Sequence, residues 1–154
     1  DFYYPKQKYN SHVATRIFKP PELLINYPYY DYSLDLWSTG LTFSIMMFKR
    51  IVMEFGQDDS EQLLKVADLV GGQGIIEYAD SLHVELEEET RSQLKKRKGT
   101  GWDRYIAKAG KTICPPEAID LLNRMMAIDH RERITAAEAL KHPYFDPLRK
   151  TSKS

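Results

Sequence analysis

Apolar residues divide the chain into helical segments of two kinds. Between Ser33 and Lys49 the only charge before the last residue is Asp35, and apolar side chains cover every face, which is typical of a helix inside a protein. Ser33 suits the N-cap of this helix, and Asp35 lies in its first turn, near the positive end of the helix dipole. In residues 60–70, by contrast, the apolar side chains share one broad face, so we expect a surface helix there.

Glycine and charge interrupt the helical pattern after Val70. The run GGQG at residues 71–74 predicts a helix stop, and residues 75–100 are strongly charged, first acidic and then basic. A nucleotide-binding loop is the alternative for the glycines, but such a loop follows a strand, and this run follows a helix. We therefore interpret residues 75–100 as an exposed insert outside the core.

Two further helices are predicted toward the C-terminus. A proline pair at residues 115–116 opens the first, and its apolar residues form a core-facing stripe. The second begins with a capping box, in which Thr135 and Glu138 each satisfy an unpaired amide, and it ends before Pro143. Residues 149–154 carry no apolar side chain, so we expect them to be mobile. The pattern as a whole predicts a mainly α-helical protein.

The composition of the chain is most useful for the partners and cross-links that it excludes. The 154 residues are 42% hydrophobic, enough for one domain with a buried core. Lysine plus arginine equal aspartate plus glutamate at 22 each, so neither nucleic acid nor a membrane is expected as a partner. The single Cys114 excludes an intrachain disulfide and indicates a small core residue in a reducing compartment.

The chain shows no signal-like start and no run of about 18 apolar residues, so an intracellular location, cytoplasmic and/or nuclear, is expected. The run KKRK at residues 95–98 has two interpretations, a nuclear-import signal or a solvated face.

Three separated motifs resemble the lower part of the large lobe of a eukaryotic protein kinase, in matching order and spacing. They are FKPPELL at 18–24 (end of the activation segment), DYSLDLWSTG at 31–40 (start of the central helix) and DHRERITAAEAL at 129–140 with HPYF at 142–145 (closing helix). FYYP at 2–5, VATRIFK at 13–19 and YDYSLD at 30–35 are most similar to the catalytic subunit of casein kinase II.

The resemblance implies a mainly α fold: the C-terminal lobe of a kinase from the activation segment onward, without the N-terminal lobe and catalytic loop. The partial kinase domain spans residues 1–147, and a polar tail (148–154) follows it. The implied parts of the domain are an activation segment with a short helix (1–26), a central buried helix (33–49), a surface helix with the charged insert (56–100) and closing helices (101–147).

The same resemblance implies a basic cluster that binds acidic protein substrates. Arg16 and Lys19, with His12 as a weaker third where the family has arginine, match the residues by which casein kinase II recognises acidic side chains C-terminal to the phosphoacceptor. Ordinary surface charge is the alternative. Thr15 matches the hydroxyl that hydrogen-bonds the catalytic aspartate and lysine. Contact with a regulatory subunit is not expected, because that contact uses the N-terminal lobe.

Four other residues have structural roles by the same resemblance. Glu22 and Arg133 match the ion pair that ties the activation segment to the last helices of the lobe. Asp35 matches a buried carboxylate that holds the catalytic loop, although a simple first-turn charge explains its position almost as well. Trp37, at the start of the central helix, is expected to be exposed when the upstream elements are missing.

The motifs with which kinases bind ATP and transfer phosphate are not found in this sequence. Asp1 and Phe2 resemble the start of the metal-binding Asp-Phe-Gly motif, but Tyr3 is not glycine. No catalytic residue or metal ligand is therefore assigned, and ATP and magnesium are implied only for the complete domain. Two functions stay open: a fragment, inactive alone, of a casein-kinase-II-like serine/threonine kinase, or a catalytically dead module for binding or scaffolding.

Overall fold

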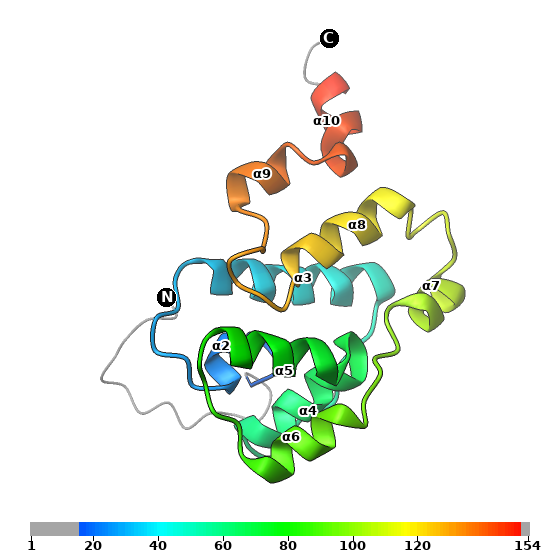
Figure 1. Cartoon of the computed structure of the whole chain (residues 1–154). Helices are drawn as coiled ribbons and strands as arrows, with labels where there is room; N and C mark the ends of the chain where they lie inside the picture. The colour runs from blue at the N-terminus through cyan, green and yellow to red at the C-terminus, as the bar shows by residue number, and fades with distance from the viewer. Residues whose placement is uncertain (1–15, 152–154) are drawn as a thin grey trace.

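The computed structural model describes residues 16–151, and within that range it contains helices and no strand (Figure 1). The elements are α2 (Pro21–Leu24), α3 (Ser33–Phe48), α4 (Asp59–Val70), α5 (Gly72–Ser81), α6 (Glu88–Lys95), α7 (Asp103–Ala109), α8 (Pro116–Met125), α9 (Ala136–Leu140), the 3₁₀ turn η1 (Pro143–Phe145) and α10 (Asp146–Thr151). The prediction of a mainly α-helical protein is confirmed. None of the described helices is long and apolar enough to cross a bilayer.

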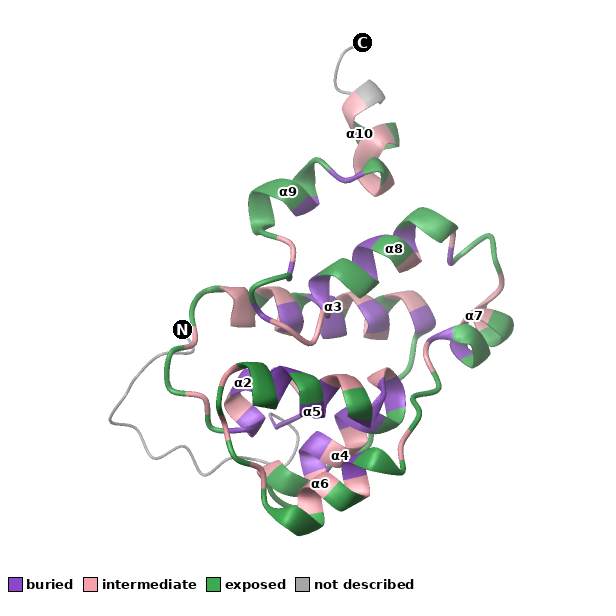
Figure 2. Cartoon of the chain, viewed as in Figure 1, coloured by how far each residue is buried: buried purple, intermediate pink, exposed green. Residues whose placement is uncertain are grey.

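Helix α3 crosses the middle of the molecule, with α8 packed against it (Figure 1). Trp37 and Leu41 are completely buried in α3, whereas Met46 is 72% exposed. The helix therefore buries one face among the described residues, and the expectation that every face is covered was wrong (Figure 2). The expected exposure of Trp37 was also wrong, because Trp37 belongs to the buried hydrophobic core.

At the start of α3, the hydrogen-bond acceptor for a free backbone amide is Asp31, whereas Ser33 was predicted to be the N-cap. Ser33 is already the first helical residue, and its backbone N–H donates to Asp31 Oδ1 at 2.8 Å. These hydrogen bonds with Ser33 lower the pKa of the Asp31 carboxyl, which stays ionised beside the unpaired amides of the helix start. Asp31 comes two residues too early for the N-cap pattern that the sequence offered.

The segment expected to be an exposed insert forms part of the core. Helix α4 ends at Val70, with Gly71 at φ 95°, as the glycine run predicts, but α5 begins at the next residue. Ile75 and Ile76 of α5 and Leu94 of α6 are buried, while most of the charged residues of α6 are exposed (Figure 2). The high average charge of residues 75–100 concealed a few apolar residues at helical spacing, and the prediction was wrong for that reason.

The C-terminal elements follow the sequence closely up to residue 148. Thr135 and Glu138 form the predicted capping box at the start of α9. The predicted tail is corrected, because α10 extends to Thr151 and Arg149 donates to the carbonyl oxygens of Leu140 and His142 at 2.6 and 3.0 Å. These contacts cap the end of α9. Residues 152–154 lie outside the described range.

Gly72 allows α6 to approach α5 closely. A Cβ atom at Gly72 would lie 1.8 Å from the Leu94 carbonyl oxygen, a backbone atom that cannot rotate away. At Gly74, two residues along the same helix, a Cβ would meet only the terminal methyl of Ile128, at 2.9 Å. We therefore expect Gly72→Ala to lower the free energy of unfolding by at least about 2 kcal/mol. Gly74→Ala should change it by no more than about 1 kcal/mol, since a flexible side chain can move and alanine favours the helix.

Urea denaturation followed by circular dichroism measures both variants. Equal effects of the two substitutions would contradict the close packing of α6 on α5.

Candidate functional site

A buried ion pair joins the two ends of the described chain. Arg133 Nη1 lies 2.8 Å from Glu22 Oε2 and Arg133 Nη2 lies 3.0 Å from Glu22 Oε1, and neither side chain is exposed. The geometry is the bidentate fork of a strong charge-assisted pair. Pro20 and Pro21 begin α2 and place Glu22 in its first turn, facing the core. The structure thus brings together the two residues that the sequence comparison paired.

The remaining donors of Arg133 are also used. Its guanidinium donates to the carbonyl oxygens of Ala127, Ser33 and Ile128 at 3.0, 3.0 and 3.2 Å. Its guanidinium carbon lies 5.5 Å from the centre of the Trp37 ring, within range of a cation–π contact. A buried charge is stable only when its hydrogen bonds are replaced in this way. Arg133 therefore connects α2, the start of α3 and the loop after α8.

Tyr78 and His130 form a second polar contact beside this pair. Tyr78 Oη lies 2.5 Å from His130 Nδ1, and both residues are buried. Burial raises the pKa of the Tyr78 hydroxyl, which therefore keeps its proton in the hydrogen bond. This contact holds α5 against the loop that carries Arg133. The sequence analysis did not identify it, because no local pattern links the two residues.

Asp35 is exposed, in the first turn of α3, and is not the buried carboxylate that the resemblance implied. Among residues 16–151, nothing covers it in the way that the implied role requires. The alternative from the sequence, a first-turn charge near the positive end of the helix, describes its position.

The cations Arg16 and Lys19 meet at one carboxylate, Asp59 of α4. Arg16 Nε lies 3.3 Å and Lys19 Nζ 3.1 Å from Asp59 Oδ1, and Lys19 Nζ lies 3.3 Å from Oδ2. Arg16 is 9% exposed, whereas the side chains of Lys19 and Asp59 are 34% and 32% exposed. The structure thus places the two predicted cations together, with a partner that the sequence analysis missed. The one feature of the sequence that could have indicated this partner is the pair of acidic residues, Asp58 and Asp59, at a helix start.

The turn before α4 fixes Arg16 in place. Arg16 Nη1 donates to the carbonyl oxygens of Gly56 and Gln57, each at 3.0 Å. Gln62 is completely buried and stabilises the turn, since its Oε1 accepts a hydrogen bond from the Gly56 N–H at 2.8 Å. A Cβ at Gly56 would lie 2.4 Å from the Gln62 backbone nitrogen, so only glycine fits there. Arg16 is therefore an internal residue that supports the surface cation Lys19.

The comparison with known families gives this arrangement a context. The model of the family described as "protein kinase domain" matches residues 1–145. The chain belongs to the protein kinase domain family. The general resemblance drawn from the three motifs is confirmed, and the helical fold agrees with a segment of a kinase C-terminal lobe. Kinases of this family generally use ATP and magnesium to phosphorylate proteins.

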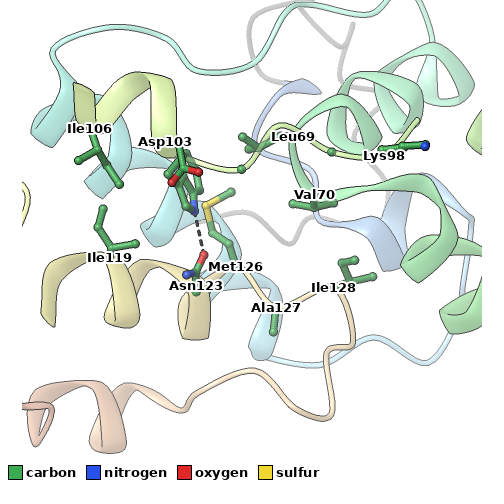
Figure 3. Close-up of a pocket in the computed structure, with 13 residues that line it drawn as sticks. Leu69, Val70, Lys98, Asp103, Ile106, Ile119, Asn123, Met126, Ala127 and Ile128 are labelled. Carbon is green, nitrogen blue, oxygen red and sulfur yellow. Dashed lines mark hydrogen bonds between the residues drawn. The ribbon is translucent and has the colours of Figure 1, made fainter. Parts of the chain in front are cut away.

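Within this kinase domain, a separate cavity of about 580 Å³ lies between the end of α4, α7 and α8 (Figure 3). Its lining combines apolar side chains, such as those of Leu69, Ile106 and Ile119, with the charged side chains of Lys98 and Asp103 (Figure 3). Trp102 Nε1 donates to Asn123 Oδ1 at 2.8 Å at its wall. None of the predicted site residues that lie within residues 16–151 lines this cavity.

The described part of the kinase domain contains no group of three or more His, Cys, Asp or Glu side chains that could hold a metal ion. His12 and Thr15, together with residues 1–3, lie outside the described residues, so their predicted roles stay predictions. Cys114 is buried, as predicted, and burial raises the pKa of its thiol, which disfavours the thiolate form.

Replacing Arg133 tests the importance of the buried pair. Arg133→Met should lower the free energy of unfolding by about 3–5 kcal/mol, because it leaves the Glu22 carboxylate buried without its partner. Arg91→Met is the matched control, since Arg91 forms an equally bidentate pair with Asp80 at 2.9 Å, but at the surface. Its effect should be much smaller. Chemical denaturation measures both, and a similar loss in the two variants would refute the special role of the buried pair.

Proposed function

We propose that the chain is the peptide-holding part of a casein-kinase-II-like serine/threonine kinase, which in its complete form uses ATP to phosphorylate serine or threonine in acidic contexts. One observation carries this proposal: a surface cation, Lys19, stands beside Arg16 on a segment anchored by the buried Glu22–Arg133 pair. A cation held in a fixed position favours a carboxylate or phosphate group on a partner. Because the whole chain is neutral, any preference for acidic peptides must arise locally.

The two cations have different parts in this proposal. The Arg16 guanidinium is nearly enclosed and donates to backbone carbonyls, so it positions the cluster. The Lys19 ammonium is one-third exposed and has three donors, so it can contact a peptide carboxylate. His12 and Thr15 keep the weaker substrate-binding and hydroxyl roles that the resemblance implies. Acidic proteins of the cytoplasm or nucleus are the proposed partners.

Phosphate transfer is not proposed for these residues by themselves. The sequence contains neither the Gly-rich phosphate loop nor the aspartate base and metal-binding residues that the reaction requires. ATP and magnesium would be held by other parts of a complete kinase domain.

A non-catalytic binding or scaffold module is the second candidate. One observation favours it: the described helices share a buried core cluster that includes the fully enclosed Trp37. Such a unit could present the cluster of Arg16 and Lys19 to acidic partners without chemistry. The two functions differ in the use of ATP, and both require that the cluster binds acidic peptides.

Removing the Lys19 charge tests that requirement. Lys19→Met keeps most of the aliphatic side chain and should weaken binding of an acidic peptide about three- to tenfold, because one partly exposed charge-assisted contact is lost. Binding of the same peptide with alanine in place of its acidic residues should not change. Fluorescence anisotropy with the two labelled peptides measures the ratio of the dissociation constants.

The matched control is Lys108→Met, which removes the same charge from α7. Lys108 is exposed, and α7 lies well away from α2 (Figure 1). An equal effect of both substitutions, or no effect of Lys19→Met on the acidic peptide, would refute the proposed function.

A further inference from the structure

We infer that Asp59 is a specificity-determining residue: its carboxylate occupies the basic cluster of Arg16 and Lys19 and competes with acidic peptides for it. The inference rests on the proposed function, since it concerns the same cluster. It adds that this chain carries its own occupant of the site, 40 residues away from Lys19 in the sequence.

The geometry of Asp59 is that of a bound acidic ligand. Its Oδ1 atom lies within 3.3 Å of both cations, and Lys19 Nζ contacts both carboxylate oxygens. A peptide carboxylate that approached Lys19 would meet the same donors. Because Asp59 belongs to the folded chain, its local concentration is far above that of a dissolved peptide. An acidic peptide must therefore displace Asp59 or share Lys19 with it.

The start of α4 holds Asp59 in this position. Asp58 is the N-cap and accepts from the Glu61 N–H at 2.8 Å, while Glu61 accepts from the Gln57 N–H at 2.8 Å. Asp59 follows as the first helical residue, where the helix dipole favours its negative charge. The turn therefore carries three carboxylates, those of Asp58, Asp59 and Glu61, against the two cations. These charges reduce, without abolishing, the attraction of the cluster for an acidic peptide.

Exposure makes the contact exchangeable. The side chains of Lys19 and Asp59 are each about one-third exposed, in contrast to the enclosed Glu22–Arg133 pair. Ion pairs at the surface are weak and are screened by salt. Asp59 can therefore leave Lys19 without unfolding the protein.

A purely structural role for Asp59 makes the opposite prediction. If Asp59 served only to clamp residues 16–19 onto α4, its neutralisation would loosen the cluster and weaken peptide binding. If it competes, its neutralisation strengthens binding. The direction of the change in affinity decides between the two roles.

The experiment compares variants of the full chain by fluorescence anisotropy. The probes are a labelled peptide with one serine followed by three glutamates and its counterpart with three alanines. Asp59→Asn keeps the shape of the side chain and should tighten binding of the acidic peptide about two- to fivefold, the scale of one partly exposed ion pair. The alanine peptide should bind Asp59→Asn and wild type equally.

Asp58→Asn is the matched control. It changes the net charge by the same amount in the same turn, and asparagine is as good an N-cap as aspartate. Asp58 is not among the residues that pair with Arg16 or Lys19 in the described range. Asp58→Asn should therefore tighten binding of the acidic peptide much less than Asp59→Asn. The gain of Asp59→Asn should also disappear in Asp59→Asn combined with Lys19→Met, which shows that the peptide uses Lys19.

The outcomes separate the inference from the proposed function. A loss of acidic-peptide binding in Asp59→Asn, no change, or an equal gain in Asp58→Asn overturns the inference while leaving the role of Lys19 intact. If no variant prefers the acidic peptide, including Asp59→Asn with its freed cations, the proposed function and the inference both fail.

Discussion

The Glu22–Arg133 ion pair imposes one arrangement on three distant parts of the chain. The two residues are 111 positions apart, and their side chains are fully enclosed. Through its other donors Arg133 also holds the carbonyl of Ser33 and the loop at residues 127–128. Moving any of these segments would leave a buried charge or carbonyl unpaired, which is costly. Helix α2, only four residues long, could not persist without such an anchor.

The proposed preference for acidic peptides depends on a weak contact on this rigid support. The buried pair fixes residues 16–25, and the turn before α4 fixes the Arg16 guanidinium against backbone carbonyls. Lys19 and Asp59 then meet at the surface, where their attraction is small and can be exchanged for that of a partner. The strong interaction thus sets position, and the weak one is proposed to set the preference for charge. Catalytic function of the family needs both a fixed peptide platform and the nucleotide machinery.

Local patterns in the sequence predicted the elements that depend on local physics. The surface helix near residues 60–70, the helix opened by the proline pair and the capping box of Thr135 and Glu138 are all present. The high average charge of residues 75–100 gave a wrong prediction for α5 and α6, because the packing there depends on Leu94 and a few other apolar residues. The buried pair could be expected only from the resemblance to kinases, and the Asp59 contact could not be expected at all, because no periodicity connects residues so far apart.

Hydrogen exchange followed by mass spectrometry tests most directly whether the buried pair anchors α2. The amides of Leu24 and Ile25 donate to the carbonyls of Pro20 and Pro21, so they report on α2. Arg133→Lys keeps the positive charge but loses the two-pronged geometry. If the pair anchors α2, exchange in residues 17–27 becomes at least about tenfold faster in this variant, while α5 keeps its protection, as expected for loss of one local unit. Unchanged exchange in residues 17–27, or an equal increase in α5, would contradict it.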